Sequence, residues 1–232
     1  MTYATISNLR EPSYLRREAI NELKTNIEFS GDNIKSLLFT SCAPNEGKTT
    51  VSFDLAKSLA IEGKTVCFLD ADLRKSVFTS RFRIDSRDGM RGLTHMLTRE
   101  NEFGDPICKT NIPGLDVIFA GRVVQDPTAM LKSNRMDVVL STLRGHYDYL
   151  IIDIAPLGSV IDAAILAPKC DGTVLVVADN ETSGRDARRV VEQLKRAGAN
   201  ILGVVMNKVP IKRADKYNYY YSANSGKKKK KK

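Results

Sequence analysis

The chain has 232 residues, of which 42% are hydrophobic and 7% aromatic, which suits one α/β domain with a buried core and excludes a fully disordered protein. Its formal net charge is +9, but the six lysines at 227–232 supply six of those charges, so the rest is only mildly basic. The four cysteines are dispersed without a C-x-x-C pair, which favours a reducing, cytoplasmic protein over a disulfide framework or a zinc site. We find no apolar run long enough for a membrane span and no signal-peptide pattern.

A helix is predicted over about residues 14–29, and we expect it to pack on the outside of the domain or against another subunit. Short apolar runs follow, with helical patterns between them. Continuous apolar runs are typical of parallel strands that are covered on both faces. The runs lie at residues 36–40, 65–69, 115–119, 149–152, 173–178 and 201–206.

The clearest helical pattern covers residues 185–197, with Ser183 and Asp186 as the predicted N-terminal cap and Gly198 as the stop. The alternation of strands and helices predicts a doubly wound, mostly parallel sheet flanked by helices. Ligands of such sheets bind outside the carboxyl ends of the strands. We expect a domain over residues 1–211 and a flexible tyrosine- and lysine-rich tail over residues 212–232.

Residues 42–50, CAPNEGKTT, follow the first predicted strand and open a helix. In a phosphate loop, backbone N–H groups surround the nucleotide phosphates, a lysine reaches the β and γ phosphates, and the next hydroxyl binds Mg²⁺. Cys42 stands where the full pattern has glycine, and an ordinary strand-to-helix turn is the alternative. Asn45 tolerates the left-handed backbone that such a loop requires. The predicted nucleotide contacts here are Pro44, Asn45, Glu46, Gly47, Lys48, Thr49 and Thr50.

Three aspartates follow predicted strands. Asp70 and Asp72 are two residues apart, so they share a face if the strand continues through them. Asp153 ends the fourth apolar run, where P-loop enzymes place an aspartate that orders Mg²⁺. The alternatives are a solvated strand end for the first two and a strand-capping role for the third.

Together these segments resemble the bacterial tyrosine kinases that control capsular and exopolysaccharide synthesis, over nearly all of residues 18–210. The phosphate loop of that family also lacks the first glycine, and its Asp-x-Asp-x-Arg segment is similar to residues 70–74. The resemblance implies ATP and Mg²⁺ as cofactors, with Lys48 and Thr49 at the phosphates and the metal. It further implies the deviant P-loop fold that the partitioning ATPases share.

The resemblance also assigns roles to other residues. Asp70 and Asp153 would hold the metal together with Thr49. Asp70 would be the base toward a tyrosine hydroxyl, with Asp72 assisting, so the implied catalytic residues are Lys48, Asp70, Asp72 and Asp153. Further contacts to the nucleotide are implied for Arg74 and, by similarity to related ATPases, for Asn207.

Septum-site and chromosome-partitioning ATPases are the competing class. Their loop carries a second lysine five residues before the P-loop lysine, and here that position is Ala43. A dimer would therefore lack the cation that stabilises the partner's phosphates, which favours the kinase. An ATPase switch of this type and a nucleotide-bound adaptor without catalysis stay open as alternatives.

Four tyrosines cluster in the tail, in a segment too polar to bury them. We interpret them as phosphoacceptors, a packed C-terminal strand being the alternative. Each phosphate adds about −1.5 to −2 charge, so four would offset most of the lysine run and act as a switch. Residue 219 lies 219 − 208 = 11 residues after Lys208, a reach of roughly 36 Å, which predicts phosphorylation of a neighbouring subunit. The acceptors are Tyr217, Tyr219, Tyr220 and Tyr221.

Assembly and partners follow from the resemblance. In the family, the helix before the first strand carries Glu-x-x-Arg-x-x-Arg, which joins subunits into a ring. The matching interface residues are Glu18, Asn21 and Lys24, and the loss of both arginines leaves ring assembly of the expected homo-oligomer open. The chain resembles the split form of the family. A transmembrane activator, which regulates polysaccharide chain length, would recruit that form to the inner face of the cell membrane through its cytoplasmic end.

The remaining partner predictions are protein substrates, including the chain itself, and a cognate tyrosine phosphatase. No nucleic-acid partner is predicted, because the domain has no platform of aromatic and basic residues for bases.

Overall fold

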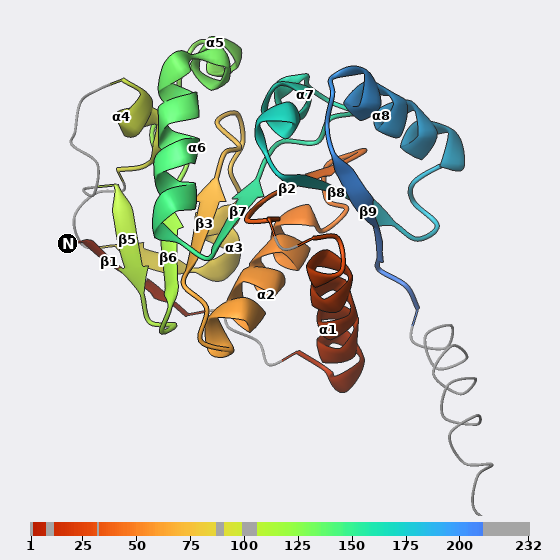
Figure 1. Ribbon diagram of the computed structural model, residues 1–232, viewed down its shortest axis with the longest axis horizontal. Helices are drawn as coiled ribbons and strands as arrows, with labels where there is room; N and C mark the ends of the chain where they lie inside the picture. Colours follow the sequence, from red (N-terminus) through yellow and green to blue (C-terminus); the bar gives the residue numbers. More distant parts are fainter. Residues whose placement is uncertain (1, 8–11, 32, 87–90, 99–105, 211–232) are drawn as a thin grey trace, which may run out of the picture.

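The computed structural model describes residues 2–7, 12–31, 33–86, 91–98 and 106–210, and within them nine strands form one sheet (Figure 1). The strand order is β4-β1-β5-β6-β3-β7-β2-β8-β9. The strands are β1 (Thr2–Ile6), β2 (Ser36–Ser41), β3 (Val66–Asp70), β4 (Ile84–Ser86), β5 (Ile107–Thr110), β6 (Leu115–Ile118), β7 (Tyr149–Asp153), β8 (Gly172–Ala178) and β9 (Ile201–Asn207).

The six strands from β6 to β9 in this order pair in parallel throughout. They are the six strands predicted from the apolar runs, and their ends agree to within about one residue. Every residue of β2, β3, β6 and β8 is buried, as expected for strands covered on both faces. The prediction of a doubly wound, mostly parallel sheet is confirmed.

The sequence analysis missed three short strands at the other edge. β1 pairs in parallel with β5 and antiparallel with β4, and β5 pairs antiparallel with β6. In β1, Ala4 and Ile6 are buried while Tyr3 and Thr5 are exposed. Such strands alternate between a covered and an open face, so they lack the continuous apolar run by which the others were recognised.

The helices form a layer on each face of the sheet (Figure 1). One face packs against α1 (Tyr14–Glu28), α2 (Lys48–Ile61) and α3 (Phe78–Phe82). The opposite face packs against α4 (Leu93–Leu97), α5 (Pro127–Lys132), α6 (Asn134–His146), α7 (Asp162–Leu166) and α8 (Gly184–Arg196). A 3₁₀ turn at Ala167–Lys169 follows α7.

Two helices were predicted closely. α1 packs on α2, where Arg16 pairs with Asp54 and Lys24 with Glu62, which agrees with an external position. The hydroxyl of Ser183 accepts a hydrogen bond from the backbone N–H of Asp186, so the cap of α8 is confirmed. In the part of the chain that is described, no helix has the length and apolar character needed to cross a bilayer.

Phe53 of α2 stands at the centre of the core on the α2 side. It is 1% exposed, and its ring meets those of Phe68 and Phe78 at centroid distances of 5.5 and 5.3 Å in edge-to-face contacts. Phe82 lies closer still, at 4.2 Å. Because edge-to-face aromatic pairs add to the burial of apolar area, this cluster holds α2 and α3 against the sheet.

We expect Phe53→Ala to lower the free energy of unfolding by about 3–5 kcal/mol, because it removes a ring from a packed core and leaves a cavity. The measurement is urea denaturation followed by circular dichroism. Phe29→Ala is the matched control, since the Phe29 side chain is 84% exposed and its loss should change stability by less than about 0.5 kcal/mol. Equal effects of the two substitutions would contradict this view of the core.

Candidate nucleotide site

The loop between β2 and α2 has the backbone of a phosphate-binding loop. Asn45 has φ +66° and Gly47 has φ +92°, so both residues adopt the left-handed conformation, as predicted for Asn45. A Cβ atom on Gly47 would lie 2.0 Å from the side-chain nitrogen of Asn207, so a larger residue cannot take this position without displacing Asn207. The loop leads directly into α2, whose N-terminus is a favourable place for an anion.

Lys48, Thr49 and Asp153 form a buried network where α2 begins. The Nζ atom of Lys48 lies 2.9 Å from Oδ1 of Asp153, and the hydroxyl of Thr49 donates to Oδ2 at 2.6 Å. The three residues are at most 7% exposed. A lysine that is held beside a helix N-terminus by a carboxylate is poised to turn toward a phosphate when one arrives.

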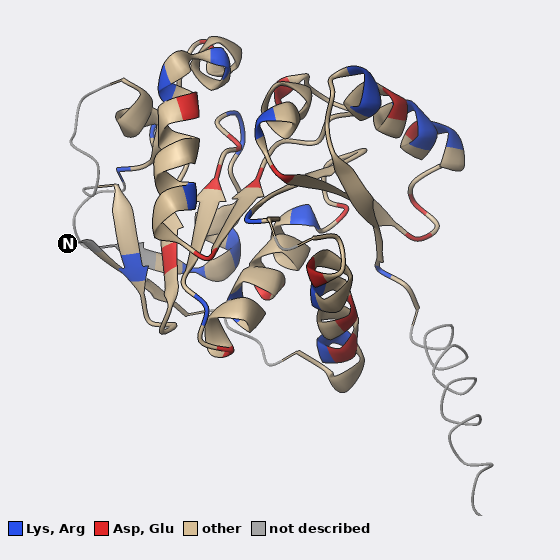
Figure 2. Cartoon of the chain, viewed as in Figure 1, with Lys and Arg blue, Asp and Glu red and all other residues tan. Residues whose placement is uncertain are grey.

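Asp70 lies next to Asp153, because the two are register partners at the ends of β3 and β7. Figure 2 shows the acidic tips of these two strands side by side. Burial, followed by the charge of Asp153, raises the pKa of Asp70 to about 7. Burial also raises the pKa of Asp153, although Lys48 and Thr49 oppose that shift. Asp70 accepts a hydrogen bond from the hydroxyl of Ser76.

This set of groups fits a magnesium ion. Mg²⁺ prefers oxygen ligands and is usually held by one or two carboxylates together with substrate phosphates. The hydroxyl of Thr49 and the carboxylates of Asp70 and Asp153 offer such oxygens beside the phosphate loop. A cation here would also relieve the repulsion and desolvation that raise the two carboxyl pKa values.

Asp72 does not continue β3, so the condition under which Asp70 and Asp72 would share a strand face is not met. The strand ends at Asp70, and the chain turns because the Asp72 N–H donates to Oδ1 of Asp70 at 3.2 Å. The Asp72 carboxylate in turn accepts from the backbone N–H groups of Arg74 and Lys75, at 3.3 and 3.0 Å. Aspartate commonly stabilises turns in this way. Asp72 remains 8% exposed, at the rim of the nucleotide pocket.

Arg74 is held by two residues that the sequence analysis did not single out. Its guanidinium forms a bidentate ion pair with Asp162, with N–O distances of 2.6 and 3.0 Å, and donates to the Thr128 hydroxyl at 2.8 Å. The Asp162 carboxylate is buried, which makes the pair directional. No local motif marks Asp162, because it comes from α7, 88 residues away in sequence.

Glu46 was predicted as a nucleotide contact, but its side chain is used inside the protein. It is 3% exposed, and its carboxylate accepts the backbone N–H groups of Cys42 and Ala43 at 2.7 and 2.8 Å. Its other oxygen accepts from the hydroxyl of Thr182, just before α8. Glu46 thus stabilises the conformation of the loop and connects it to the segment before α8.

The remaining predicted contacts lie around the same pocket. Asn207, at the end of β9, donates to the backbone oxygen of Glu46 at 2.9 Å, so its side chain contacts the phosphate loop. Thr50 accepts from Arg81 of α3 at 2.6 Å. The pocket has a volume of about 270 Å³, and its lining includes Pro44, Asn45, Gly47, Lys48, Thr49, Asp72, Arg74 and Arg81.

The predicted interface residues follow one another along α1. The side-chain nitrogen of Asn21 donates to Glu18 at 3.4 Å, and Lys24 lies 3.5 Å from Asn21 while it pairs with Glu62 of its own chain. The predicted phosphoacceptors are outside the described residues. They are Tyr217, Tyr219, Tyr220 and Tyr221.

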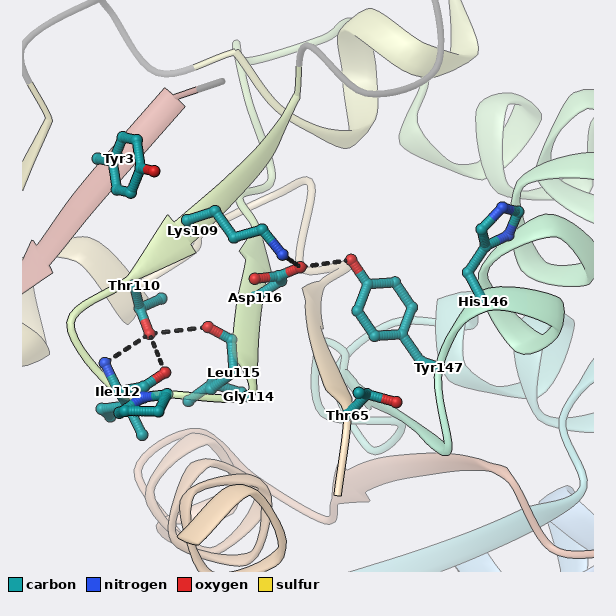
Figure 3. A pocket seen from close by; sticks show the side chains of 11 residues that line it. Tyr3, Thr65, Lys109, Thr110, Ile112, Gly114, Leu115, Asp116, His146 and Tyr147 are labelled. Carbon is teal, nitrogen blue, oxygen red and sulfur yellow. Dashed lines mark hydrogen bonds and ion pairs between the residues drawn. The ribbon is translucent and has the colours of Figure 1, made fainter. Parts of the chain in front are cut away.

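A separate hollow of about 450 Å³ lies at the amino end of β6, remote from the phosphate loop (Figure 3). Lys109 and the hydroxyl of Tyr147 both meet the buried carboxylate of Asp116, each at 2.7 Å. Tyr3 lies beside Lys109 on the neighbouring strand. The Asp116 carboxylate thus joins β5 and β6 to the residue that follows α6.

Comparison with known proteins identifies relatives of the whole domain. A family described as an AAA domain matches residues 45–201. The tyrosine-protein kinase CpsD of Streptococcus pneumoniae is 43% identical over 212 residues, which are 91% of this chain and 92% of that protein. The kinase domain of the Escherichia coli tyrosine kinase ETK has a TM-score of 0.79 at 28% identity, covering 90% of this chain and 89% of that one.

The septum site-determining protein MinD of Pyrococcus horikoshii, solved with Mg-ADP, has a lower TM-score of 0.64. It is 23% identical and covers 79% of this chain and 76% of its own. At that identity the likeness shows the shared P-loop ATPase fold alone. A nucleotide is therefore the ligand that both the relatives and the loop geometry indicate.

Asp70 should make the nucleotide-free protein sensitive to pH. Its folded-state pKa of about 7 exceeds the unfolded value near 3.9, so its stabilising contribution is complete below about pH 4 and is lost as the pH rises through 7. We expect Asp70→Asn to raise Tm relative to wild type by more at pH 8 than at pH 5. Asp148→Asn is the control, because hydrogen bonds from Thr65 lower the pKa of Asp148 and its contribution stays constant over this range. A pH-independent difference for Asp70→Asn would contradict the raised pKa.

Glu46→Ala should weaken ADP binding about tenfold or more, because it leaves the N–H groups of Cys42 and Ala43 without their acceptor and loosens the loop. Glu46→Gln should have a smaller effect, since its amide oxygen can accept both N–H bonds while the amide nitrogen replaces the oxygen that Thr182 contacts. Isothermal titration calorimetry measures both. Glu62→Ala, at the C-terminal end of α2, is the matched control. Wild-type affinity in Glu46→Ala would exclude the role given to Glu46.

Proposed function

The chain belongs to the bacterial tyrosine-protein kinases, and from this we propose that it transfers the γ-phosphoryl group of ATP to tyrosines of its own C-terminal segment. The observation that carries the proposal is the pairing of Asp70 with Asp153 beside Lys48. A P-loop ATPase that acts as a switch needs to order a metal ion and the water that attacks the nucleotide. A kinase also needs a carboxylate that can accept a proton from a hydroxyl nucleophile.

We assign the nucleotide to the phosphate loop, with Lys48 turning from Asp153 to the β and γ phosphates. Thr49, Asp70 and Asp153 would hold Mg²⁺, which neutralises charge on the phosphates when bound. The N–H groups around Gly47 complete the phosphate contacts at the start of α2. Asn207 lies close enough to the loop to reach the nucleotide from the end of β9.

Asp70 is the proposed base. As the tyrosine oxygen forms its bond to the γ-phosphorus, the hydroxyl proton passes to the Asp70 carboxylate, and the bond to the β–γ bridging oxygen breaks to leave ADP. Asp72 assists by holding the turn at the rim, and Arg74 stays oriented toward the pocket by Asp162.

We also propose that residues 1–211 form the catalytic domain and residues 212–232 the segment that carries the acceptors. Phosphorylation would take place between subunits of a homo-oligomer, with Glu18, Asn21 and Lys24 at the subunit contact. The proposed partner is a membrane protein whose cytoplasmic end activates the kinase and recruits it to the inner face of the membrane. The regulated process is capsular or exopolysaccharide production, and a tyrosine phosphatase would reverse the modification.

An ATPase switch of the septum-site type is the second candidate, supported by the shared fold. The sequence at Ala43 opposes it, because no second lysine is available there to contact the phosphates of a partner subunit. The two functions differ in their product, which makes them separable in one assay.

The test incubates the pure chain with ATP, Mg²⁺ and the cytoplasmic segment of the activator, followed by a phosphotyrosine blot and a phosphate-release assay. We expect phosphotyrosine, its loss in Lys48→Met, and a decrease of at least about 100-fold in Asp70→Asn, in line with the usual contribution of a general base. Substitution of the four C-terminal tyrosines by phenylalanine should remove most of the signal while ADP binding stays intact. Free phosphate without phosphotyrosine would identify an ATPase instead.

A further inference from the structure

The exposed face of α8 carries arginines that make no ion pair or hydrogen bond with the described residues. Figure 2 shows Lys and Arg along this helix. Arg185 and Arg188 are exposed and form no ion pair or hydrogen bond with any residue that the structure describes. Arg189 is partly engaged by Asp186 at 3.5 Å. The apolar side of the helix, with Val190 and Leu194, is buried in the core.

The two carboxylates on this face, of Asp186 and Glu192, already have partners within the same helix or its cap. Asp186 accepts from the hydroxyl of Ser183 at 2.6 Å, and Glu192 lies 3.8 Å from Arg196. An open hollow on this face is lined by Ser183, Arg185, Asp186, Arg188, Arg189 and Glu192. An incoming anion would therefore meet two unpaired guanidinium groups at the first two turns of the helix.

This end of α8 lies beside both the phosphate loop and the start of the C-terminal segment. Thr182, next to the helix cap, is bonded to Glu46 in the loop. Lys208, just after β9, pairs with Glu181 at 2.7 Å. Tyr217 follows Lys208 by 217 − 208 = 9 residues, which can extend roughly 30 Å, whereas α8 is only about 20 Å long. The tyrosine cluster of the same chain can thus reach Arg185 and Arg188.

We infer that Arg185 and Arg188 of α8 bind phosphotyrosine in residues 217–221 of this chain. The inference rests on the proposed function, because only phosphorylation of that segment creates the ligand. Each phosphate brings about −1.5 to −2 charge, and arginine forks bind phosphate oxygens bidentately. The unmodified segment, rich in lysine, is repelled by the same face. Phosphorylation would move the segment out of the neighbouring subunit's active site and hold it against α8 of its own chain.

A phosphopeptide fits this face better than a membrane surface does. Helices that lie in a membrane interface insert large apolar side chains. The apolar residues of α8 face the protein core, and its outer face is polar. Vesicles of anionic lipid are therefore included in the test as the competing ligand.

The experiment measures binding of a synthetic peptide of residues 212–226 to the Lys48→Met chain by fluorescence anisotropy, with the four tyrosines phosphorylated or unmodified. We expect the phosphorylated peptide to bind at least about tenfold more tightly, and Arg185→Gln with Arg188→Gln to remove that advantage. Lys195→Gln with Arg196→Gln is the matched control, since it removes two charges from the last turn of the same helix and should leave binding within about twofold.

Three outcomes would overturn the inference. The first is equal binding of the phosphorylated and unmodified peptides. The second is an equal loss of phosphopeptide binding in the two double variants. The third is that Arg185→Gln with Arg188→Gln loses binding to phosphatidylglycerol vesicles but binds the phosphopeptide as before. Both double substitutions lie on an exposed surface, and unchanged thermal unfolding would show that they fold. Because the peptide is synthetic and the chain carries Lys48→Met, the result does not depend on kinase activity. Peptide binding without autophosphorylation would contradict the proposed function and not the site.

Discussion

The interaction on which the whole site depends is the close approach of two buried carboxylates that share a single neighbouring lysine. Asp70 and Asp153 lie side by side at the ends of β3 and β7, and Lys48 pairs with only one of them. Burying two negative charges this closely is unfavourable unless a further cation or a proton compensates. The nucleotide-free site therefore stores an electrostatic imbalance that a magnesium–nucleotide complex is suited to relieve. The same imbalance gives one carboxyl a pKa near neutrality.

The features that could be predicted from the sequence are those encoded within a few neighbouring residues. The parallel strands have continuous apolar runs, the phosphate loop has its glycine, lysine and threonine in order, and the cap of α8 is a local pair. The short strands β1, β4 and β5 have no such run. The pairing of β1 with β4 and β5 joins residues about 78 to 106 positions apart, which no local pattern reveals, while β5 and β6 form a local antiparallel pair.

The same distinction holds at the site. The sequence motifs and strand ends predicted four site residues, and the structure brings these together: Lys48, Thr49, Asp70 and Asp153. The partners that hold the site in shape come from elsewhere in the chain. Asp162 orients Arg74, and Thr182 and Asn207 engage Glu46. Whether β3 continues to Asp72 could not be decided from the sequence, because a turn residue and a strand residue look alike when both follow an apolar run. Kinases and ATPases share this fold, so the function depends on the side chains of the site.

The close approach of Gly47 and Asn207 has a consequence for biosynthesis. Asn207 belongs to the last strand of the sheet, and its side chain occupies the space that the missing Cβ of Gly47 leaves open while it bonds to the backbone of Glu46. A nascent chain that has not yet emerged from the ribosome as far as β9 lacks this contact, although its phosphate loop has long been synthesised. The nucleotide site is thus completed only when β9 has been made, 161 residues after Glu46 of the phosphate loop.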